Sequence, residues 1–151
     1  MPEISEVIDC REYKLDLHES QKAPVTCNGE HYWNLEAVVS NANNEKLKKD
    51  FHVIRRLLTY WIDDHYWKFR PEEPVRIVFM CREGRHHSVA ACRIIVEVLK
   101  LSGYNAQAFH YLSQSEREPG ECSSCEYCDK NYSSKVDLYN RAVKMWYDEE
   151  L

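Results

Sequence analysis

The chain contains no apolar run that approaches the roughly 20 residues needed to cross a bilayer, so its sequence predicts no membrane span. Its first residues, MPEISEVIDCREYK, also lack the basic stretch and the following apolar stretch that mark a secretion signal. From these two absences we expect a cytosolic protein with no membrane partner.

Positive charge is also scarce, because 20 lysines and arginines stand against 25 aspartates and glutamates, for a formal net charge of −5. Proteins that bind nucleic-acid phosphates usually carry a basic stripe, so this balance argues against a broad nucleic-acid-binding face. RNA therefore stays an alternative partner rather than the expected one. A length of 151 residues and a hydrophobic content of 44% predict one globular domain over residues 1–151.

The apolar pattern predicts strands that alternate with helices. A first strand is expected at residues 4–10, a loop-rich stretch at 11–34 and a long amphipathic helix at about 44–69, with Lys46, Lys48 and Lys49 in its polar beginning. A central strand is expected at 75–80, a helix from Val89 onward that ends at Gly103, and a further strand after it. The last helix is expected at about 134–149, where Ser134 and Asp137 resemble a capping box.

This order of elements predicts an α/β fold, with a parallel-containing sheet and helices on both faces. Ligands of such sheets bind at the carboxyl ends of the strands. The segment CREGRHHS, at residues 81–88, follows the central strand at that end. We therefore expect the functional site there.

Residues 81–88 have the properties of an anion-binding loop. They precede a helix, whose first turn presents free backbone N–H groups and the positive end of the helix dipole. The side chains add further donors around the same point, and the expected ligand-binding residues are Arg82, Gly84, Arg85, His86, His87 and Ser88. A phosphate or a carboxylate would be bound favourably by such a loop.

The same segment resembles the sequence C-T-G-G-x-H-R-S-V in the C-terminal domain of RapZ proteins, bacterial RNase adapters that sense an amino-sugar phosphate. The matching residues are Cys81, Gly84, His86, Ser88 and Val89. The likeness covers about residues 1–112 and runs on to Phe109-His110, at the end of the next strand in the family. It implies that His110 contacts the ligand.

The segment also departs from the family pattern. Arg82 and Glu83 replace the threonine and the first glycine, and His87 replaces the arginine. The resemblance therefore implies a phosphate-containing ligand without identifying it.

Three of the seven cysteines, Cys122, Cys125 and Cys128, form a C-x2-C-x2-C pattern in a polar connection at residues 113–133. This connection has too few apolar residues to pack by itself, and neighbouring thiolates at such spacing can bind one zinc ion. A tetrahedral site needs a fourth ligand, for which we favour His110 over His86, His87 or Cys81. Free thiols and an iron–sulfur cluster are the alternatives.

Cys81, at the end of a strand and before a polar loop, also permits an enzymatic interpretation. In the C-x5-R loop of cysteine phosphatases, a thiolate attacks phosphorus and an arginine binds the phosphate oxygens. Here the arginine position is His87, which offers at most one donor to the phosphate. A thiol enzyme with Cys81 as nucleophile and His86 or His87 as acid–base partner is thus an alternative to binding alone.

The sequence therefore favours a domain that binds a phosphorylated small molecule, or another phosphate anion, and that contains a structural zinc site. An RNA- or protein-interaction adapter module is the remaining alternative.

Overall fold

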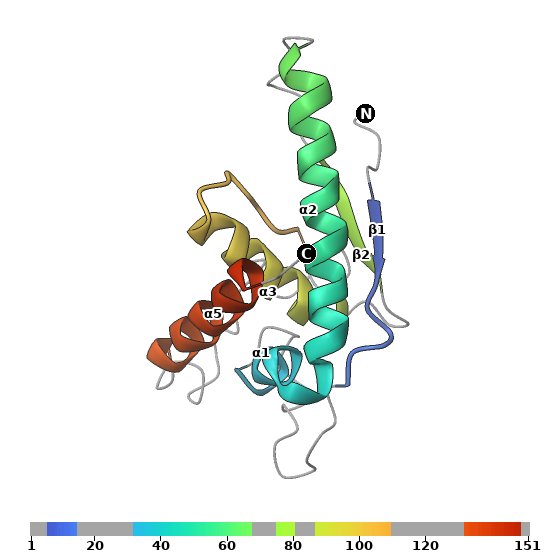
Figure 1. The fold of residues 1–151 in the computed structure, drawn as a ribbon. Helices are drawn as coiled ribbons and strands as arrows, with labels where there is room; N and C mark the ends of the chain where they lie inside the picture. The colour runs from blue at the N-terminus through green and yellow to red at the C-terminus, as the bar shows by residue number, and fades with distance from the viewer. Residues whose placement is uncertain (1–5, 15–31, 68–74, 81–86, 110–131, 149–151) are drawn as a thin grey trace.

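The computed structural model describes residues 6–14, 32–67, 75–80, 87–109 and 132–148 (Figure 1). In chain order, these residues form β1 (Glu6–Asp9), α1 (Tyr32–Val39), a short 3₁₀ helix η2 (Asn41–Asn43), α2 (Asn44–Trp67), β2 (Ile77–Met80), α3 (His87–Leu101) and α5 (Tyr132–Tyr147). The described part of the chain is thus mainly helical, with one small sheet. None of its helices is both long and apolar enough to cross a membrane.

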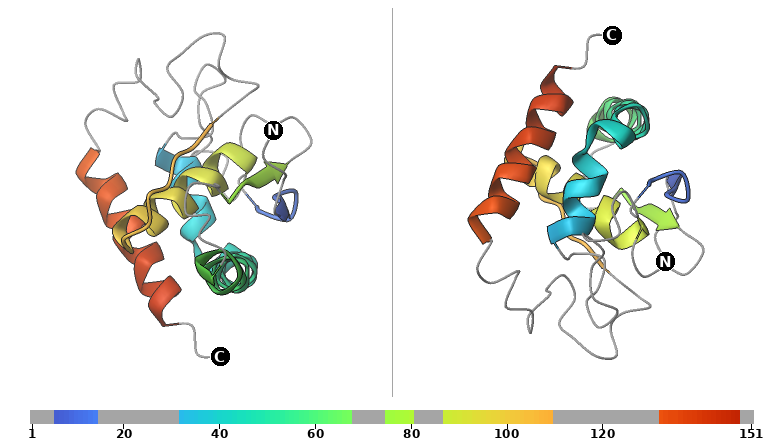
Figure 2. Two further views of the ribbon diagram at one scale, coloured as in Figure 1. Left: turned by 90° about the horizontal axis from the view of Figure 1, so that it is seen from above. Right: turned by 90° about the horizontal axis from the view of Figure 1, so that it is seen from below.

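The sheet consists of β1 and β2, which run parallel with Glu6 opposite Ile77 and Asp9 opposite Met80. Side chains alternate between its two faces. Ile8, with Phe79 opposite, packs into the core. On the other face Val7 and Met80 are 48% and 39% exposed. The predicted combination of parallel strands and helices is therefore confirmed, and the described helices contribute their apolar faces to a core on one side of the sheet (Figure 2).

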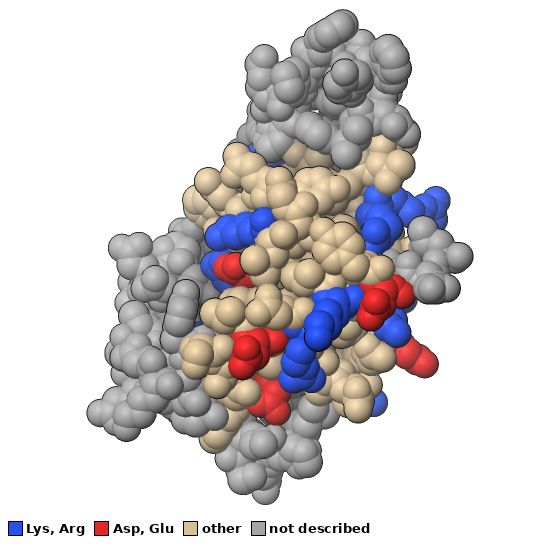
Figure 3. All heavy atoms as spheres, turned by 60° about the vertical axis from the view of Figure 1, so that its left-hand side comes forward, with Lys and Arg blue, Asp and Glu red and all other residues tan. Residues whose placement is uncertain are grey.

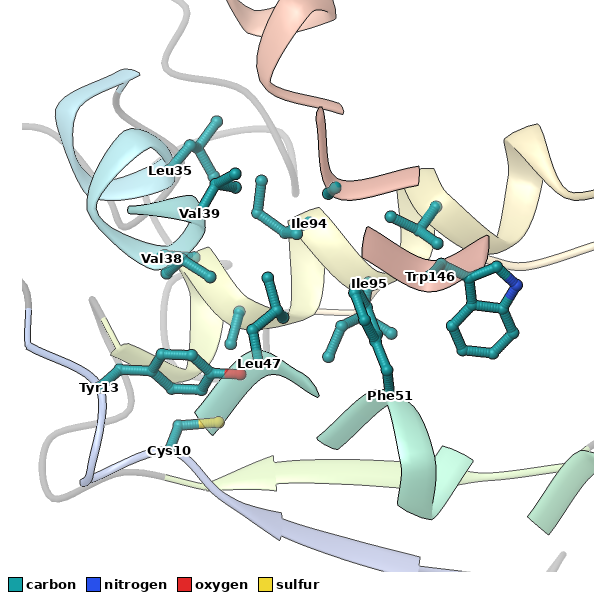
Figure 4. Close-up of a cluster of buried hydrophobic side chains, with 14 of the residues drawn as sticks. Cys10, Tyr13, Leu35, Val38, Val39, Leu47, Phe51, Ile94, Ile95 and Trp146 are labelled. Atoms are coloured by element: carbon teal, nitrogen blue, oxygen red, sulfur yellow. The ribbon is translucent and has the colours of Figure 1, made fainter. Parts of the chain in front are cut away.

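The core forms where α1, α3 and α5 pack against one another and α2 lies across them (Figure 1). The long helix α2 contributes Leu47, Phe51 and Ile54, which recur at the spacing of one helical face. Figure 4 shows the side chains of Leu47 and Phe51 beside Ile94 and Ile95 of α3, and Ile54 belongs to the same buried cluster. Burial on this apolar face explains why the sequence forms a helix over Asn44–Trp67, close to the predicted 44–69.

Trp146 of α5 joins this core to the last helix. Its ring lies edge-on to the ring of Phe51, with 5.4 Å between the centroids and an interplanar angle of 90°. The guanidinium of Arg55 lies 4.2 Å from the centre of the Trp146 ring and donates a hydrogen bond to the Trp146 carbonyl oxygen. An aromatic contact and a cation–π contact therefore fix α5 against α2.

Gly103 ends α3 as the sequence predicts. Its φ of 97° lies in the left-handed region that favours glycine. The N–H of Tyr104 donates to the Leu99 carbonyl at 2.9 Å, and the N–H of Gly103 donates to the Lys100 carbonyl at 3.1 Å. This bond pair is the Schellman motif, which satisfies carbonyls that the helix end would leave free.

Three predictions about individual elements were wrong. The stretch at 11–34 was expected to be loop, but α1 begins at Tyr32 because its following residues bury Leu35 and Val38. Ser134 does not cap the last helix, because that helix already includes Tyr132 and Ser133. Residues 104–109 form no strand, although Ala106 and Ala108 are half-buried while their neighbours are exposed. Asparagine and alanine, which make up half of this segment, are depleted in strands, which accounts for the missing strand.

Candidate functional site

The predicted anion-binding segment joins β2 to α3. Because β2 ends at Met80 and α3 begins at His87, residues 81–86 make the whole connection. His87 and Ser88, which were predicted as loop residues, instead begin the helix, where buried Val89 and Ala90 follow at once. The side chain of Ser88 is buried. The other residues predicted here lie outside the described residues: Cys81, Arg82, Gly84, Arg85 and His86.

Helix starts gather on one side of the molecule. In both views of Figure 2, α1, α3 and α5 begin on the same side, and the segment that follows α3 also ends there. The three helices pack against one another. The start of a helix carries the positive end of the helix dipole, so three dipole ends of the same sign lie on this side of the molecule.

The predicted zinc ligands His110, Cys122, Cys125 and Cys128 lie outside the described residues. Within those residues, no group of three or more His, Cys, Asp or Glu side chains could hold a metal ion. Cys10 and Cys92 are buried and form no disulfide. The described ends of the cysteine-rich connection, the segment after α3 and the start of α5, lie on the same side as the start of α3 (Figure 2).

An ion pair stands at the carboxyl edge of the sheet. The N–H of Cys10 donates to the Met80 carbonyl at 2.7 Å, and Arg11 follows directly. Arg11 donates to the Asp9 carboxylate from Nε at 2.9 and 3.1 Å and from Nη2 at 2.6 Å. Its backbone N–H donates to Asp9 Oδ1 at 3.0 Å. These bonds lower the pKa of Asp9 to about 2, and the carboxylate raises the pKa of Arg11.

The depressed pKa of Asp9 fixes how this pair responds to pH. The pair contributes stability above the ordinary aspartate pKa of 3.8, and this contribution is lost as the pH falls towards 2. Both side chains are exposed, so solvent screens the pair and its contribution is small. Near neutral pH, the carboxylate stays ionised and orients the guanidinium.

A buried polar network holds the chain that leaves β1. The Tyr13 hydroxyl donates to Asp50 Oδ2 at 2.6 Å, and the Lys46 ammonium donates to Asp50 Oδ1 at 2.9 Å. Lys46 and Asp50 side chains are only 10% and 4% exposed. Burial, and next the charge of Asp50, raises the pKa of Tyr13. The folded state therefore holds this proton more tightly than the unfolded chain and loses stability as the pH rises above 10.

Asn43 fixes the same segment one residue further on. Its side-chain oxygen accepts a hydrogen bond from the Lys14 N–H at 2.8 Å, and its amide nitrogen donates to the Lys14 carbonyl at 2.9 Å. The amide nitrogen also donates to the Ala37 carbonyl at 2.7 Å. Residues 10–14 are thus bonded to β2, η2 and α2, which holds the carboxyl edge of β1 in a defined position.

Sequence reasoning missed this network. Lys46 was predicted as part of a polar helix beginning, but its ammonium is nearly buried against Asp50. A signal was present, because Asp50 falls between Leu47, Phe51 and Ile54 on the apolar face of α2. A carboxylate at such a position requires a buried partner, and Lys46 is one helical turn away.

Charges on the visible surface are mixed. On the face shown in Figure 3, lysines and arginines lie close to aspartates and glutamates among uncharged residues. A nucleic-acid-binding face usually concentrates positive charge instead. The described residues of this face therefore do not provide a broad basic surface.

Comparison of the chain with protein-family models, curated proteins and solved structures found no match. The likeness to the RapZ C-terminal domain therefore rests on the residues of the 81–89 segment and on His110.

Proposed function

We propose that the chain binds a phosphorylated small molecule, or the phosphate of a larger partner, at residues 81–88. One observation carries the proposal: a parallel strand ends at Met80, and a buried amphipathic helix begins at His87. A short connection of this kind brings a helix N-terminus to the carboxyl edge of a sheet, where α/β proteins bind anions. The cationic and imidazole groups between the two elements supply the side-chain donors.

In this proposal, the first N–H groups of α3 and the backbone after Gly84 contact the phosphate oxygens. Arg82, Arg85, His86 and His87 provide charge, and Ser88 and His110 provide further donors. The likeness to the RapZ C-terminal domain supports a phosphorylated amino sugar as one ligand class. Thiol chemistry at Cys81 with His86 or His87, and an RNA- or protein-adapter role, remain the alternatives to phosphate binding.

The finer fold is part of the same proposal. We infer a single domain over residues 1–151 in which helices cover both faces of the sheet, as doubly wound folds require. Val7 and Met80 are exposed on one face of the sheet, and none of the described helices covers that face.

We further propose that Cys122, Cys125, Cys128 and His110 bind one structural zinc ion. The composition of residues 113–133 supports this, because that connection has too little apolar surface to form a core. Zinc binding requires thiolates, which a reducing cytosolic location would preserve.

Phosphate binding is tested by calorimetric titration of the protein with inorganic phosphate and with a hexose phosphate. Replacement of both Arg85 and His86 by alanine is expected to weaken binding at least tenfold, because each charge-assisted hydrogen bond contributes about 1.5–3 kcal/mol. Arg56→Ala is the matched control, since Arg56 is exposed on α2 and is not part of the 81–88 segment. Equal affinity in the double variant would reject the proposal. Aryl phosphate turnover that disappears in Cys81→Ser would favour the enzyme instead.

Elemental analysis of protein purified without chelator is expected to find about one zinc per chain. Cys125→Ser should lose the metal and lower the thermal midpoint, because metal binding contributes to folding. Cys92→Ser is the control, since this buried thiol on α3 is separate from the cysteine triplet. Metal-free wild-type protein, or Cys125→Ser with unchanged zinc content, would show that the cysteines are not zinc ligands.

A further inference from the structure

Residues 104–109 follow α3 as a strand-like chain without a partner strand. After the turn that ends α3, the chain doubles back along the molecule (Figure 2). Ala106 and Ala108 are half-buried, with Ala106 packed against the core, whereas the residues beside them are exposed. This alternation is typical of a strand that lies on a protein surface. The described residues 105–108 nevertheless make no hydrogen bond, so their backbone N–H and C=O groups are unpaired.

Unpaired backbone groups on an extended chain are a template for the addition of another strand. Proteins commonly protect such an edge with charged side chains or with proline. Residues 101–109 contain neither, although 30% of the residues in the whole chain are charged. Asn105 and Gln107 are exposed, so solvent reaches this part of the chain. A second extended chain can therefore approach it without opposition from like charge.

Large apolar side chains are exposed on the same segment. Leu101 is 55% exposed, Tyr104 is 37% exposed and Phe109 is 64% exposed. Because a full aromatic side chain offers about 150–250 Å², the exposed parts of these three amount to roughly 300 Å². A stable interface between two copies of a chain needs about 800 Å² on each copy. The segment is thus too small to form a stable dimer by itself, and its size fits a short peptide.

We propose that residues 104–109 bind an extended, uncharged peptide segment of a partner protein, which adds to them as a strand. The backbone of the partner pairs with the N–H and C=O groups of residues 105–108, and its apolar side chains contact Tyr104 and Phe109. Each backbone bond contributes little net free energy, so the binding is weak and reversible. This interaction is independent of phosphate binding at residues 81–88.

The test adds a capped peptide of alternating threonine and valine to isotope-labelled protein and follows amide hydrogen exchange by NMR. Successive N–H groups of an extended chain point to opposite edges, so every second amide among residues 105–108 should become protected. At a peptide concentration of about ten times the dissociation constant, exchange of these amides should slow about tenfold, because they exchange only from the free protein.

Two proline variants provide a matched pair. Gln107→Pro and Ala108→Pro remove N–H groups that point to opposite edges, and neither N–H makes a hydrogen bond in the free protein. The variant at the protected amide should lose peptide binding, whereas the other should lose less. The thermal midpoint of both variants should stay close to that of the wild type, which shows that each still folds.

Unchanged exchange in millimolar peptide would overturn the inference. Equal protection by the same peptide with every backbone nitrogen methylated would also overturn it, because apolar contact alone would then explain binding. Protection that rises with protein concentration in the absence of peptide would assign this edge to a second copy of the chain instead. Changes confined to the amides of Val7 and Met80 would place the peptide on the exposed face of the sheet and reject residues 104–109.

Discussion

Replacement of Asp50 by alanine is expected to destabilise the protein by about 3–5 kcal/mol. The change leaves the Lys46 ammonium nearly buried without its counter-charge and removes the acceptor of the Tyr13 hydroxyl. Breaking one side of a buried ion pair costs more than the pair contributes, because the remaining charge must stay out of water. Urea unfolding measures the loss as a lower midpoint.

Two matched variants test the cause. Lys48→Ala, on an exposed position of the same helix, should change stability by no more than about 0.5 kcal/mol. Replacing Lys46 by methionine and Asp50 by leucine together should recover much of the loss, because no unpaired charge then remains. The network also makes wild-type protein less stable above pH 10, and Tyr13→Phe should remove this dependence. A loss below about 1 kcal/mol for Asp50→Ala would show that water reaches Lys46.

Phe51→Ala is expected to cost about 3–5 kcal/mol, because it removes a fully buried ring and leaves a cavity. The ring also makes the edge-on contact with Trp146, so α5 should loosen from α2. A domain of this size has a total stability of about 5–15 kcal/mol, so the loss is a large fraction of it. Urea unfolding followed by intrinsic fluorescence, to which all four tryptophans contribute, measures the lower midpoint.

Tyr60→Ala is the control on the same helix, since Tyr60 is 69% exposed and should contribute less than about 0.5 kcal/mol. Phe51→Leu keeps most of the volume and should lose less than Phe51→Ala, which provides a folded variant for comparison. Equal effects of Phe51→Ala and Tyr60→Ala would contradict the core as described.

The sequence predicted the elements whose pattern is local. The strand at Ile77–Met80 and the helix over Asn44–Trp67 follow from apolar spacing, and the end of α3 follows from Gly103. The short helix α1 was missed because its eight residues give only two turns of pattern, next to a polar stretch. Its formation depends on packing against α3, which a local pattern does not contain.

At the candidate site, too, a local sequence pattern predicts some residues, whereas only tertiary structure brings others to the carboxyl edge of the sheet. The loop between a strand and a helix could be recognised from residues 81–88 alone, whereas Arg11 is brought to that edge only by the pairing of β1 with β2. The partnership of Tyr13 with Asp50 joins residues 37 positions apart. Contacts between residues this far apart depend on tertiary structure, so no sequence motif predicts them.

The parallel pairing of β1 with β2 has a consequence for the order of folding. β1 is synthesised first, but 67 residues that include α1, η2 and α2 separate it from β2, so the ladder can close only after these residues have been synthesised. Until then, Val7 and Ile8 form an unpaired apolar strand that could join another chain. Glu6 and Asp9 flank this pair and act as charged gatekeepers against aggregation. The negative charge of Asp9 thus opposes association of the nascent chain, and in the folded protein the same carboxylate orients the Arg11 guanidinium.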